Sequence, residues 1–266
     1  MIVSETSGLE SLGGDNYLLT LSVPEGRFAA LGRFARLRSW PMPSLGPGTL
    51  LDRPFSIHGI GRGTLSFLIR KVGPATALLA GLAKGDPVRV IGPLGTGLDD
   101  LDPAFGEKKW YLVAGGAGLG PMGSLMAALG DRARLFYGER SGKSQVGSGY
   151  LRGLSRDADG SGIVTTTEDG TGYGLKGLVT EPLLRGLGEE KRPIVACGPP
   201  GLLAAAARAA LDHGVGYFAC AEARMACGLG VCLSCTLPKL DGSNFRVCRE
   251  GPMVDGLSLD WDRIRA

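Results

Sequence analysis

The sequence predicts a multidomain β plus α/β protein that consists of an antiparallel β-barrel, a Rossmann-like domain and a small C-terminal domain. The first third reads as short strands separated by glycine and proline, which is typical of a small barrel. The middle third alternates buried strands with helices, as α/β sheets do. Four closely spaced cysteines follow. We expect the three domains at residues 1–103, 104–216 and 217–266, a division that a chain of 266 residues can accommodate.

The overall composition is that of a globular protein with a sizeable core. Hydrophobic residues make up 44% of the chain, and the net charge of +3 is too small to indicate a nucleic-acid partner. The N-terminus shows no basic-then-apolar leader, and no apolar run has the length of a membrane span. We therefore expect a soluble, cytoplasmic protein without a membrane partner, in which the isolated Cys197 and Cys220 are reduced.

The barrel prediction rests on alternating apolar and polar residues between sharp turns. Strands are predicted at residues 17–23, 33–38, 64–70 and 87–91. Residues 75–83 have a helical pattern, and we expect this helix to close one end of the barrel.

Two polar corners of the predicted barrel are candidate binding sites. The first corner is residues 53–56. The guanidinium of Arg53 can make a two-pronged contact with a pyrophosphate, Pro54 restricts the backbone, and Ser56 can hydrogen-bond a flavin ring. Around Gly73 a glycine turn leads into a helix N-terminus, which suits a phosphate. The alternative for the first corner is an ordinary edge strand that begins near a proline.

A glycine turn between a strand and a helix marks the predicted nucleotide domain. The buried strand at residues 108–114 runs into glycines at 115, 116 and 118, and a helix follows at 123–129. This arrangement places the pyrophosphate of a dinucleotide on backbone amides. Further strands are predicted at 134–138, 162–166 and 193–197, with helices at 179–187 and 202–211. We infer a parallel sheet whose ligands bind at the carboxyl ends of its strands.

Two further stretches of this domain bear on a nicotinamide cofactor. Cys197 ends the strand at 193–197, where it can lie beside a nicotinamide ring; the alternative is a small buried residue. Arg140, Ser141 and Lys143 follow the second strand, where the 2′-phosphate of NADP would bind. A solvated turn explains these three residues as well, so the choice between NAD and NADP stays open.

The four cysteines near the C-terminus have the spacing of an iron–sulfur site. Cys227, Cys232 and Cys235 form a C-x4-C-x2-C pattern, and Cys248 follows after twelve residues, which resembles the order in plant-type [2Fe-2S] proteins. Glycines at 228 and 230 let such a loop fold tightly around a cluster. A zinc site usually has two Cys-x2-Cys pairs, and a disulfide framework suits a short secreted chain, so both alternatives fit less well.

Together these motifs resemble the ferredoxin–NADP reductase superfamily, and within it the electron-transfer subunits of dihydroorotate dehydrogenase B. The resemblance is carried by residues 53–56, 115–118, 169–170, 176–180, 197–199, 222–228 and 246–252. It implies FAD in the barrel, NAD(H) in the middle domain and a [2Fe-2S] cluster on the four cysteines. For FAD it implies Arg53, Pro54, Phe55, Ser56, Leu68, Ile69, Arg70, Gly73, Ala75 and Thr76. For NAD(H) it implies Gly115, Gly116, Gly118, Cys197, Gly198 and Pro199.

The resemblance also implies that two subunits share the reaction. Members of the family accept electrons from an FMN-containing dihydroorotate dehydrogenase catalytic subunit, in a heterotetramer, and pass them through the cluster and FAD to NAD+ in pyrimidine biosynthesis. Because dihydroorotate then reacts on the partner, we expect no catalytic acid or base in this chain. The two histidines, His58 and His213, are expected to have no role.

The chemistry of the three expected cofactors leads to the same function. A nicotinamide takes up two electrons as hydride, a cluster carries one electron at a time, and a flavin can exchange both. One alternative is a subunit of an NADPH–ferredoxin oxidoreductase or of a sulfide dehydrogenase. Another is an iron–sulfur redox sensor without enzymatic turnover.

Overall fold

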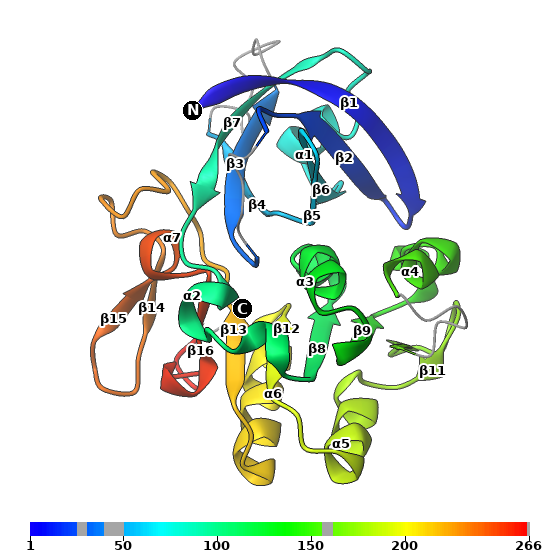
Figure 1. Cartoon of the computed structure of the whole chain (residues 1–266), viewed down its shortest axis with the longest axis vertical. Coiled ribbons are helices and arrows are strands. Elements are labelled where there is room, and N and C mark those ends of the chain that lie inside the picture. Colours follow the sequence, from blue (N-terminus) through cyan, green and yellow to red (C-terminus); the bar gives the residue numbers. More distant parts are fainter. Residues whose placement is uncertain (26–30, 40–50, 156–161, 265–266) are drawn as a thin grey trace.

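The computed structural model describes residues 1–25, 31–39, 51–155 and 162–264. These residues form two seven-stranded sheets and a two-stranded hairpin. Figure 1 shows the first sheet at the top, the α/β sheet with its helices below it, and the hairpin to one side. Within these residue ranges, no helix combines the length and the apolar character needed to cross a membrane.

The first sheet is antiparallel and curls into a barrel. Its strand order is β4-β3-β7-β1-β2-β6-β5, so β4 and β5 are its two edges. Only two residues separate these edge strands in the sequence, which brings the edges back toward each other, as Figure 1 shows. The strands are β1 Ile2–Gly13, β2 Asn16–Ser22, β3 Phe34–Ser39, β4 Arg53–Ser56, β5 Gly59–Gly61, β6 Thr64–Arg70 and β7 Pro87–Leu94.

Alternating side chains fill the barrel, as the sequence predicts. In β6, Leu65, Phe67 and Ile69 are all fully buried in the barrel core, because successive side chains of a strand point to opposite faces. Helix α1 covers Pro74–Leu79 and adds Leu79 to this core. It is shorter than the predicted 75–83, because it stops before Gly81, a residue that weakens helices.

The second sheet has the strand order of a Rossmann-like domain. The order is β11-β10-β9-β8-β12-β13-β16, and all neighbours are parallel except β13 and β16. Along the chain, β9, β10 and β11 are added on one side of β8, and β12 and β13 on the other. The strand order therefore reverses between β8 and β12, and such a switch point is where α/β sheets bind ligands. The strands are β8 Trp110–Gly115, β9 Ala133–Glu139, β10 Ile163–Thr167, β11 Leu175–Lys176, β12 Ile194–Cys197, β13 Tyr217–Cys220 and β16 Met253–Asp255.

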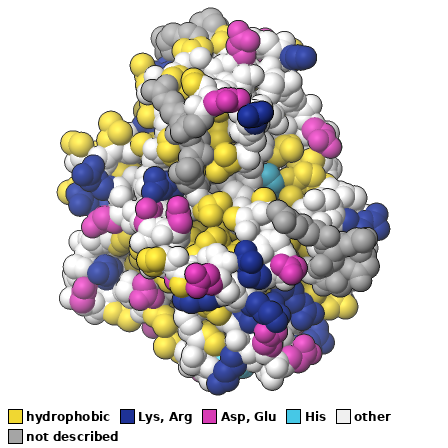
Figure 2. All heavy atoms as spheres, in the orientation of Figure 1, with side chains coloured by type: hydrophobic (Ala, Val, Ile, Leu, Met, Phe, Trp, Pro, Cys, Tyr) yellow, Lys and Arg dark blue, Asp and Glu magenta, His cyan; other side chains and the backbone are white. Residues whose placement is uncertain are grey.

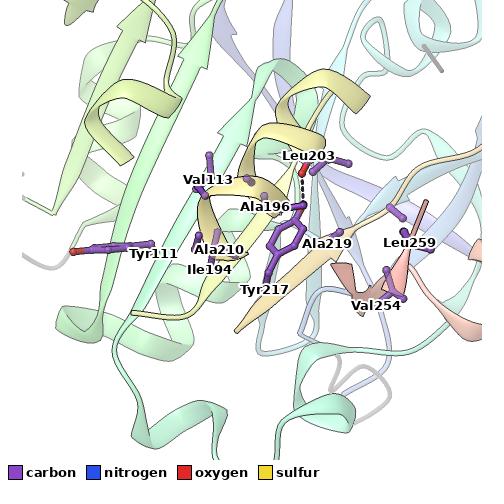
Figure 3. Packing of buried hydrophobic residues seen from close by; sticks show 14 of the residues in the cluster. Tyr111, Val113, Ile194, Ala196, Leu203, Ala210, Tyr217, Ala219, Val254 and Leu259 are labelled. Atoms are coloured by element: carbon purple, nitrogen blue, oxygen red, sulfur yellow. Dashed lines mark hydrogen bonds between the residues drawn. The ribbon is translucent and has the colours of Figure 1, made fainter. Parts of the chain in front are cut away.

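Helices cover both faces of this sheet and create two separate cores. Helices α5 and α6 contribute to one core, and α3 and α4 to the other. Figure 3 shows the first core, in which Tyr217 reaches α6 and donates a hydrogen bond to the carbonyl of Leu203 at 3.0 Å. The α-helices of this half are α2 Leu98–Leu101, α3 Met122–Leu129, α4 Ser148–Leu154, α5 Thr180–Glu189 and α6 Pro200–His213. Short 3-10 turns lie at Phe105–Glu107, Gly116–Leu119, Gly130–Arg132, Gly142–Ser144 and Gly256–Ser258.

The cysteine-rich segment leaves the α/β sheet and returns to it. It begins after β13 and ends before β16, which pairs with β13. Between them, β14 Thr236–Pro238 and β15 Asn244–Arg246 form the hairpin, and the short helix α7 Val247–Glu250 follows. Anchoring at both ends holds this segment beside the sheet.

Candidate functional site

The four cysteines converge from two elements of the C-terminal segment. Cys227, Cys232 and Cys235 lie in the loop before β14, and Cys235 is the last residue of this loop. Cys248 lies in α7. The amide of Val247 donates to the carbonyl of Cys235 at 3.1 Å, which brings α7 to the loop. Cys235 and Cys248 are 2% and 3% exposed, whereas Cys232 is exposed. The site therefore has a buried side and a side that faces solvent.

Backbone amides of the loop point at the sulfurs. The amide of Gly230 donates to the Sγ atom of Cys248 at 3.1 Å, and that of Leu229 donates to Cys227 Sγ at 3.3 Å. This geometry depends on the two glycines, because Gly228 and Gly230 have φ values of +66° and +81°. Hydrogen bonds from such amides set the properties of iron–sulfur clusters.

The same donors favour thiolates on the solvent side of the loop. The Leu229 amide, followed by that of Cys232, lowers the pKa of Cys227. The Ser234 hydroxyl is the main cause that lowers the pKa of Cys232 to about 6. Burial raises the pKa of Cys248 to about 11, so this thiol needs the charge of a bound metal to lose its proton.

The donor set fits an iron–sulfur cluster. Four thiols, with amide donors to the sulfurs of Cys227 and Cys248, are the ligands and surroundings that such clusters use. Nowhere in residues 1–25, 31–39, 51–155 and 162–264 do three or more His, Cys, Asp or Glu side chains form a group that could hold a single metal ion.

A cavity of about 870 Å³ lies at the switch point of the α/β sheet. Its walls include the glycine turn after β8, the loop after β12, the end of β9 and the C-terminal residues Trp261 and Ile264. Of the residues expected to bind cofactors, it contains Arg70, Gly115, Gly116, Gly118, Gly198 and Pro199. The size and position of the cavity suit a dinucleotide.

The glycine turn is packed too closely for side chains. A Cβ atom on Gly118 would overlap the carbonyl oxygen of Cys197 and lie 2.8 Å from the Gly198 nitrogen. A Cβ atom on Gly115 would lie 2.7 Å from Leu202, and Gly116 has a φ of +58°. The turn after β8 therefore rests directly on the turn after β12, with its backbone open to the cavity.

Arg70 reaches this cavity from the barrel. It forms an ion pair with Glu139 at the end of β9, and its Nε donates to Asn16 Oδ1 at 3.0 Å. Its guanidinium also donates to the carbonyl of Ser144 at 3.2 Å. Sequence reasoning grouped Arg70 with the flavin residues and missed Glu139. The signal for Glu139 was its position about 20 residues after the glycine turn, where dinucleotide folds carry an acid for the ribose.

The remaining flavin candidates lie on the barrel, outside the residues that line this cavity. Residues 53–56 are half-buried on edge strand β4, and the Cβ of Ser56 comes within 3.5 Å of a Cβ built on Gly120. Leu68 and Ile69 point their side chains into two different cores, so only their backbone is available to a cofactor.

The loop before α1 is organised by its own threonine. The Thr76 hydroxyl accepts from the amides of Val72 and Gly73 at 2.9 and 3.0 Å, and it donates to the Gly73 carbonyl. The neighbouring Ala75 is half-buried.

His58, for which the sequence predicts no role, lies between the barrel and the α/β domain. Its Nδ1 hydrogen-bonds the carbonyl of Gly120 at 2.7 Å, and its Nε2 hydrogen-bonds the hydroxyl of Tyr150. A Cβ on Gly123 would lie 2.6 Å from His58 Cε1, so α3 packs directly on this ring. Burial lowers the pKa of His58. His213 lies at the end of α6, where it hydrogen-bonds the carbonyl of Ala209.

Cys197 and Glu222 lie together near the cavity. Cys197 is fully buried, and its Sγ lies 4.0 Å from Oε1 of Glu222. Its hydrogen bond with Cys220, followed by burial, raises the pKa of the Cys197 thiol. The Glu222 side chain is open to the cavity but surrounded by protein, and this desolvation raises its pKa. No sequence pattern singled out Glu222 as a lining residue, because its contact with Cys197 spans 25 residues.

Two family models match the chain in the regions that form these sites. Residues 222–260 match the iron–sulfur cluster binding domain of dihydroorotate dehydrogenase B, and residues 112–208 match the oxidoreductase NAD-binding domain.

Curated relatives extend the similarity over nearly the whole chain. The dihydroorotate dehydrogenase B (NAD(+)) electron transfer subunit of Desulforamulus reducens is 30% identical over 93% of this chain and 94% of that protein. The protein of the same name from Listeria monocytogenes serovar 1/2a is 34% identical over 77% of this chain and 79% of its own length.

Solved structures share the fold at lower identity. The NADH-dependent reduced ferredoxin-NADP oxidoreductase has a TM-score of 0.76, with 20% identity over 98% of this chain and 91% of that chain. A ferredoxin NADP+ reductase from Neisseria gonorrhoeae has a TM-score of 0.58, with 18% identity over 80% of this chain and 91% of that chain.

The fold, the cavity at the switch point and the cysteine loop define an oxidoreductase of the ferredoxin–NADP reductase type that carries an iron–sulfur domain. This confirms the predicted fold class. Within that class, the chain belongs to the family of dihydroorotate dehydrogenase B electron transfer subunits. The predicted resemblance is thereby confirmed.

Proposed function

We propose that this chain takes electrons from a catalytic partner subunit at its cysteine loop and delivers them, through FAD in the barrel, to NAD+ in the α/β cavity. The observation that carries the proposal is the presence, in one chain, of a four-thiol loop with amide donors and a dinucleotide cavity. When bound, a flavin supplies the exchange between one-electron and two-electron transfer. The names of the relatives support the direction of transfer toward NAD+.

We assign the cofactors to three segments, residues 1–103, 104–216 and 217–266. The first would bind FAD with Arg53 on the pyrophosphate and Ser56 near the ring, supported by the half-buried position of β4 and its closeness to Gly120. The proposed contacts also include Pro54, Phe55, Leu68, Ile69, Arg70, Gly73, Ala75 and Thr76.

The second segment would bind NAD(H) with its pyrophosphate on the glycine turn. The proposed contacts are Gly115, Gly116, Gly118, Cys197, Gly198 and Pro199. Glu139 lies at the strand end where dinucleotide folds place the acid that binds the ribose, which favours NAD+ over NADP+. Arg140 also lines the cavity and favours the alternative, an NADPH–ferredoxin oxidoreductase. Reduction of the purified protein by NADH at least tenfold faster than by NADPH supports the first assignment.

In the third segment, Cys227, Cys232, Cys235 and Cys248 would hold the [2Fe-2S] cluster, and the partner would dock over its exposed side. Leu229, Val231 and Leu233 lie close to Cys232 in the sequence and are 56%, 79% and 56% exposed. Figure 2 shows hydrophobic side chains at this edge of the molecule, where Figure 1 places α7 and the adjoining loop. Apolar patches of this kind mark protein interfaces. We propose that the occupant is the FMN-containing dihydroorotate dehydrogenase catalytic subunit, in a cytoplasmic heterotetramer that serves pyrimidine biosynthesis.

Anaerobic purification of the full chain, with measurement of iron, sulfide and FAD, tests this function. The expected protein contains all three, and NADH reduces it. The variant Cys232→Ala is expected to lose iron and sulfide while it keeps FAD, because Cys232 lies outside the barrel. As a matched control, Cys220→Ala removes a thiol that is not in the loop and should keep the cluster. Zinc in place of iron, or a full cluster in Cys232→Ala, would contradict the assignment.

A further inference from the structure

Arg36 of the barrel reaches into the cysteine loop. It lies on β3 and is only 6% exposed, although it carries a charge. Its guanidinium donates to the carbonyl of Ala226 at 2.8 Å and also to the carbonyl of Cys227. The packing is close, because a Cβ on Gly228 would lie 3.1 Å from Arg36 Nε. One barrel side chain thus holds the backbone of the first cysteine in the loop.

The same guanidinium contacts the strand that begins the proposed flavin site. Its Nη2 donates to the carbonyl of Asp52 at 3.4 Å, and Asp52 directly precedes Arg53. Arg36 also pairs with Pro54 across the β3–β4 ladder. A single rigid group therefore connects the loop proposed to hold the cluster with the strand proposed to hold FAD.

Arg36 belongs to a group of arginines that lie around one buried carboxylate. The Asp52 carboxylate, 3% exposed, lies within ion-pair distance of three arginines, at 3.8 Å from Arg36, 3.5 Å from Arg38 and 2.6 Å from Arg89. Because water screens buried charges poorly, the charge of the Arg36 guanidinium acts strongly on the groups next to it. The cysteine loop therefore lies against a buried, positively charged guanidinium.

We propose that Arg36 is a positioning residue for electron transfer that fixes the cluster loop relative to the flavin strand and raises the reduction potential of the cluster. Reduction adds negative charge to the cluster, and a nearby buried positive charge stabilises that state. The two carbonyl hydrogen bonds fix the loop, because a guanidinium presents several donors in a rigid fork. The proposal rests on the proposed function, since it requires the cluster and the flavin to be present.

Two substitutions separate the charge from the geometry. Arg36→Gln removes the charge and keeps a side-chain donor, whereas Arg36→Lys keeps the charge and loses the fork. Arg33→Gln is the matched control. Arg33 lies just before β3 on the same chain segment, but its partner is the more exposed Asp100, at 2.6 Å.

The measurement is a redox titration of the anaerobically purified full chain, followed by electron paramagnetic resonance of the cluster. We expect Arg36→Gln to lower the cluster potential by about 59 mV, which is tenfold in a one-electron equilibrium. Arg36→Lys should keep the potential near that of the parent, while transfer between cluster and flavin after rapid mixing with NADH slows by about tenfold because the loop is held less rigidly. Arg33→Gln should change neither quantity.

Iron and FAD contents of every variant are measured first. Loss of iron from Arg36→Gln with FAD retained, while Arg33→Gln keeps both, supports the part of the proposal that concerns loop position. Potentials and transfer rates equal to those of the parent in both Arg36 variants would overturn it. A parent protein without any cluster signal would instead overturn the proposed function, so the two failures are distinguishable.

Discussion

His58 contacts two parts of the α/β domain through its two ring nitrogens. One nitrogen bonds the Gly120 carbonyl, at the end of the glycine turn, and the other bonds the Tyr150 hydroxyl on α4. Burial is the largest influence on this histidine and lowers its pKa, and the backbone carbonyl contacts oppose burial only in part. The folded protein therefore favours neutral His58.

A pH dependence of stability follows from the neutral state of His58. The unfolded chain titrates near the usual value of about 6.5, so below that pH the unfolded state binds more protons than the folded state. The contribution of His58 to stability should be complete above about pH 6.5 and should be lost as the pH falls through this region. Urea unfolding at about pH 7 and pH 5.5 measures the difference.

The variant His58→Gln should be less stable at neutral pH but should show a flatter dependence between these two pH values. His213→Gln, which replaces the other histidine, is the control and should keep the slope of the parent. Equal slopes in the parent and in His58→Gln would show that another group causes the acid sensitivity.

At the scale of elements, the turns after β8 and β12 pack against each other at the cavity that is proposed to bind the dinucleotide. The first turn carries Gly118 against the carbonyl of Cys197, and this contact leaves no room for a methyl group. A substitution there moves one strand end relative to the other. The amides that would hold the pyrophosphate lie on the displaced segment.

We therefore expect Gly118→Ala to weaken NADH binding by at least tenfold, or about 1.4 kcal/mol. Isothermal titration with NADH measures this loss in the flavin-loaded protein after chemical reduction of its FAD, so that no hydride is transferred during the titration. Gly153→Ala is the matched control, because Gly153 lies in α4 and a Cβ there would meet nothing within 4 Å. If Gly118→Ala binds NADH as tightly as the control does, the turn is not the pyrophosphate site.

The elements themselves were largely predictable. Strand β6 has the bounds that the alternation predicts, and α6 extends the predicted 202–211 by a few residues at its two ends. Strand β1 was missed, since Ser4, Thr6 and Gly8 dilute its apolar pattern although Ser4 and Thr6 are buried. Burial of those polar residues depends on the neighbouring strands, which a local pattern does not contain.

At the scale of the whole molecule, polar contacts join the barrel to the rest of the chain. Among the residues that the structure describes, these contacts include that of Arg36 with the cysteine loop, that of His58 with Gly120 and Tyr150, and that of Arg70 with Glu139. Glu139 is nearly buried, with 4% of its side chain exposed, and Arg70 is 20% exposed. The Tyr137 hydroxyl also donates to Glu139, at 2.8 Å.

Removing one partner of this pair should destabilise the protein. Arg70→Gln leaves the Glu139 carboxylate without its arginine, and we expect the free energy of unfolding to fall by about 3 kcal/mol. Glu139→Gln should also lower the free energy of unfolding. The double variant should lower it by less than the sum of the two single effects, because the two residues interact. Urea unfolding monitored by tryptophan fluorescence measures all three variants.

Lys71→Gln provides the matched control for this cycle. Lys71 is next to Arg70 and pairs with Asp15, but both side chains are largely exposed, at 43% and 64%. Such a surface pair contributes little to stability, because water and salt screen it. If the stability losses of Arg70→Gln and Glu139→Gln are strictly additive in the double variant, the ion pair does not couple the barrel to the α/β sheet.

The sequence by itself determined the class of each domain, the four cysteines and the glycine turn. Strand alternation, turn glycines and cysteine spacing are local properties. They depend on residues that are close in the sequence, so they can be recognised without knowledge of the rest of the fold. The tertiary structure alone decided that Arg70 lines the cavity at the switch point, that His58 lies between the barrel and the α/β sheet, and that Arg36 holds the cysteine loop. The Arg36 contact joins residues that are 190 positions apart. Contacts of that range depend on how the two sheets and the loop pack, which no local pattern records.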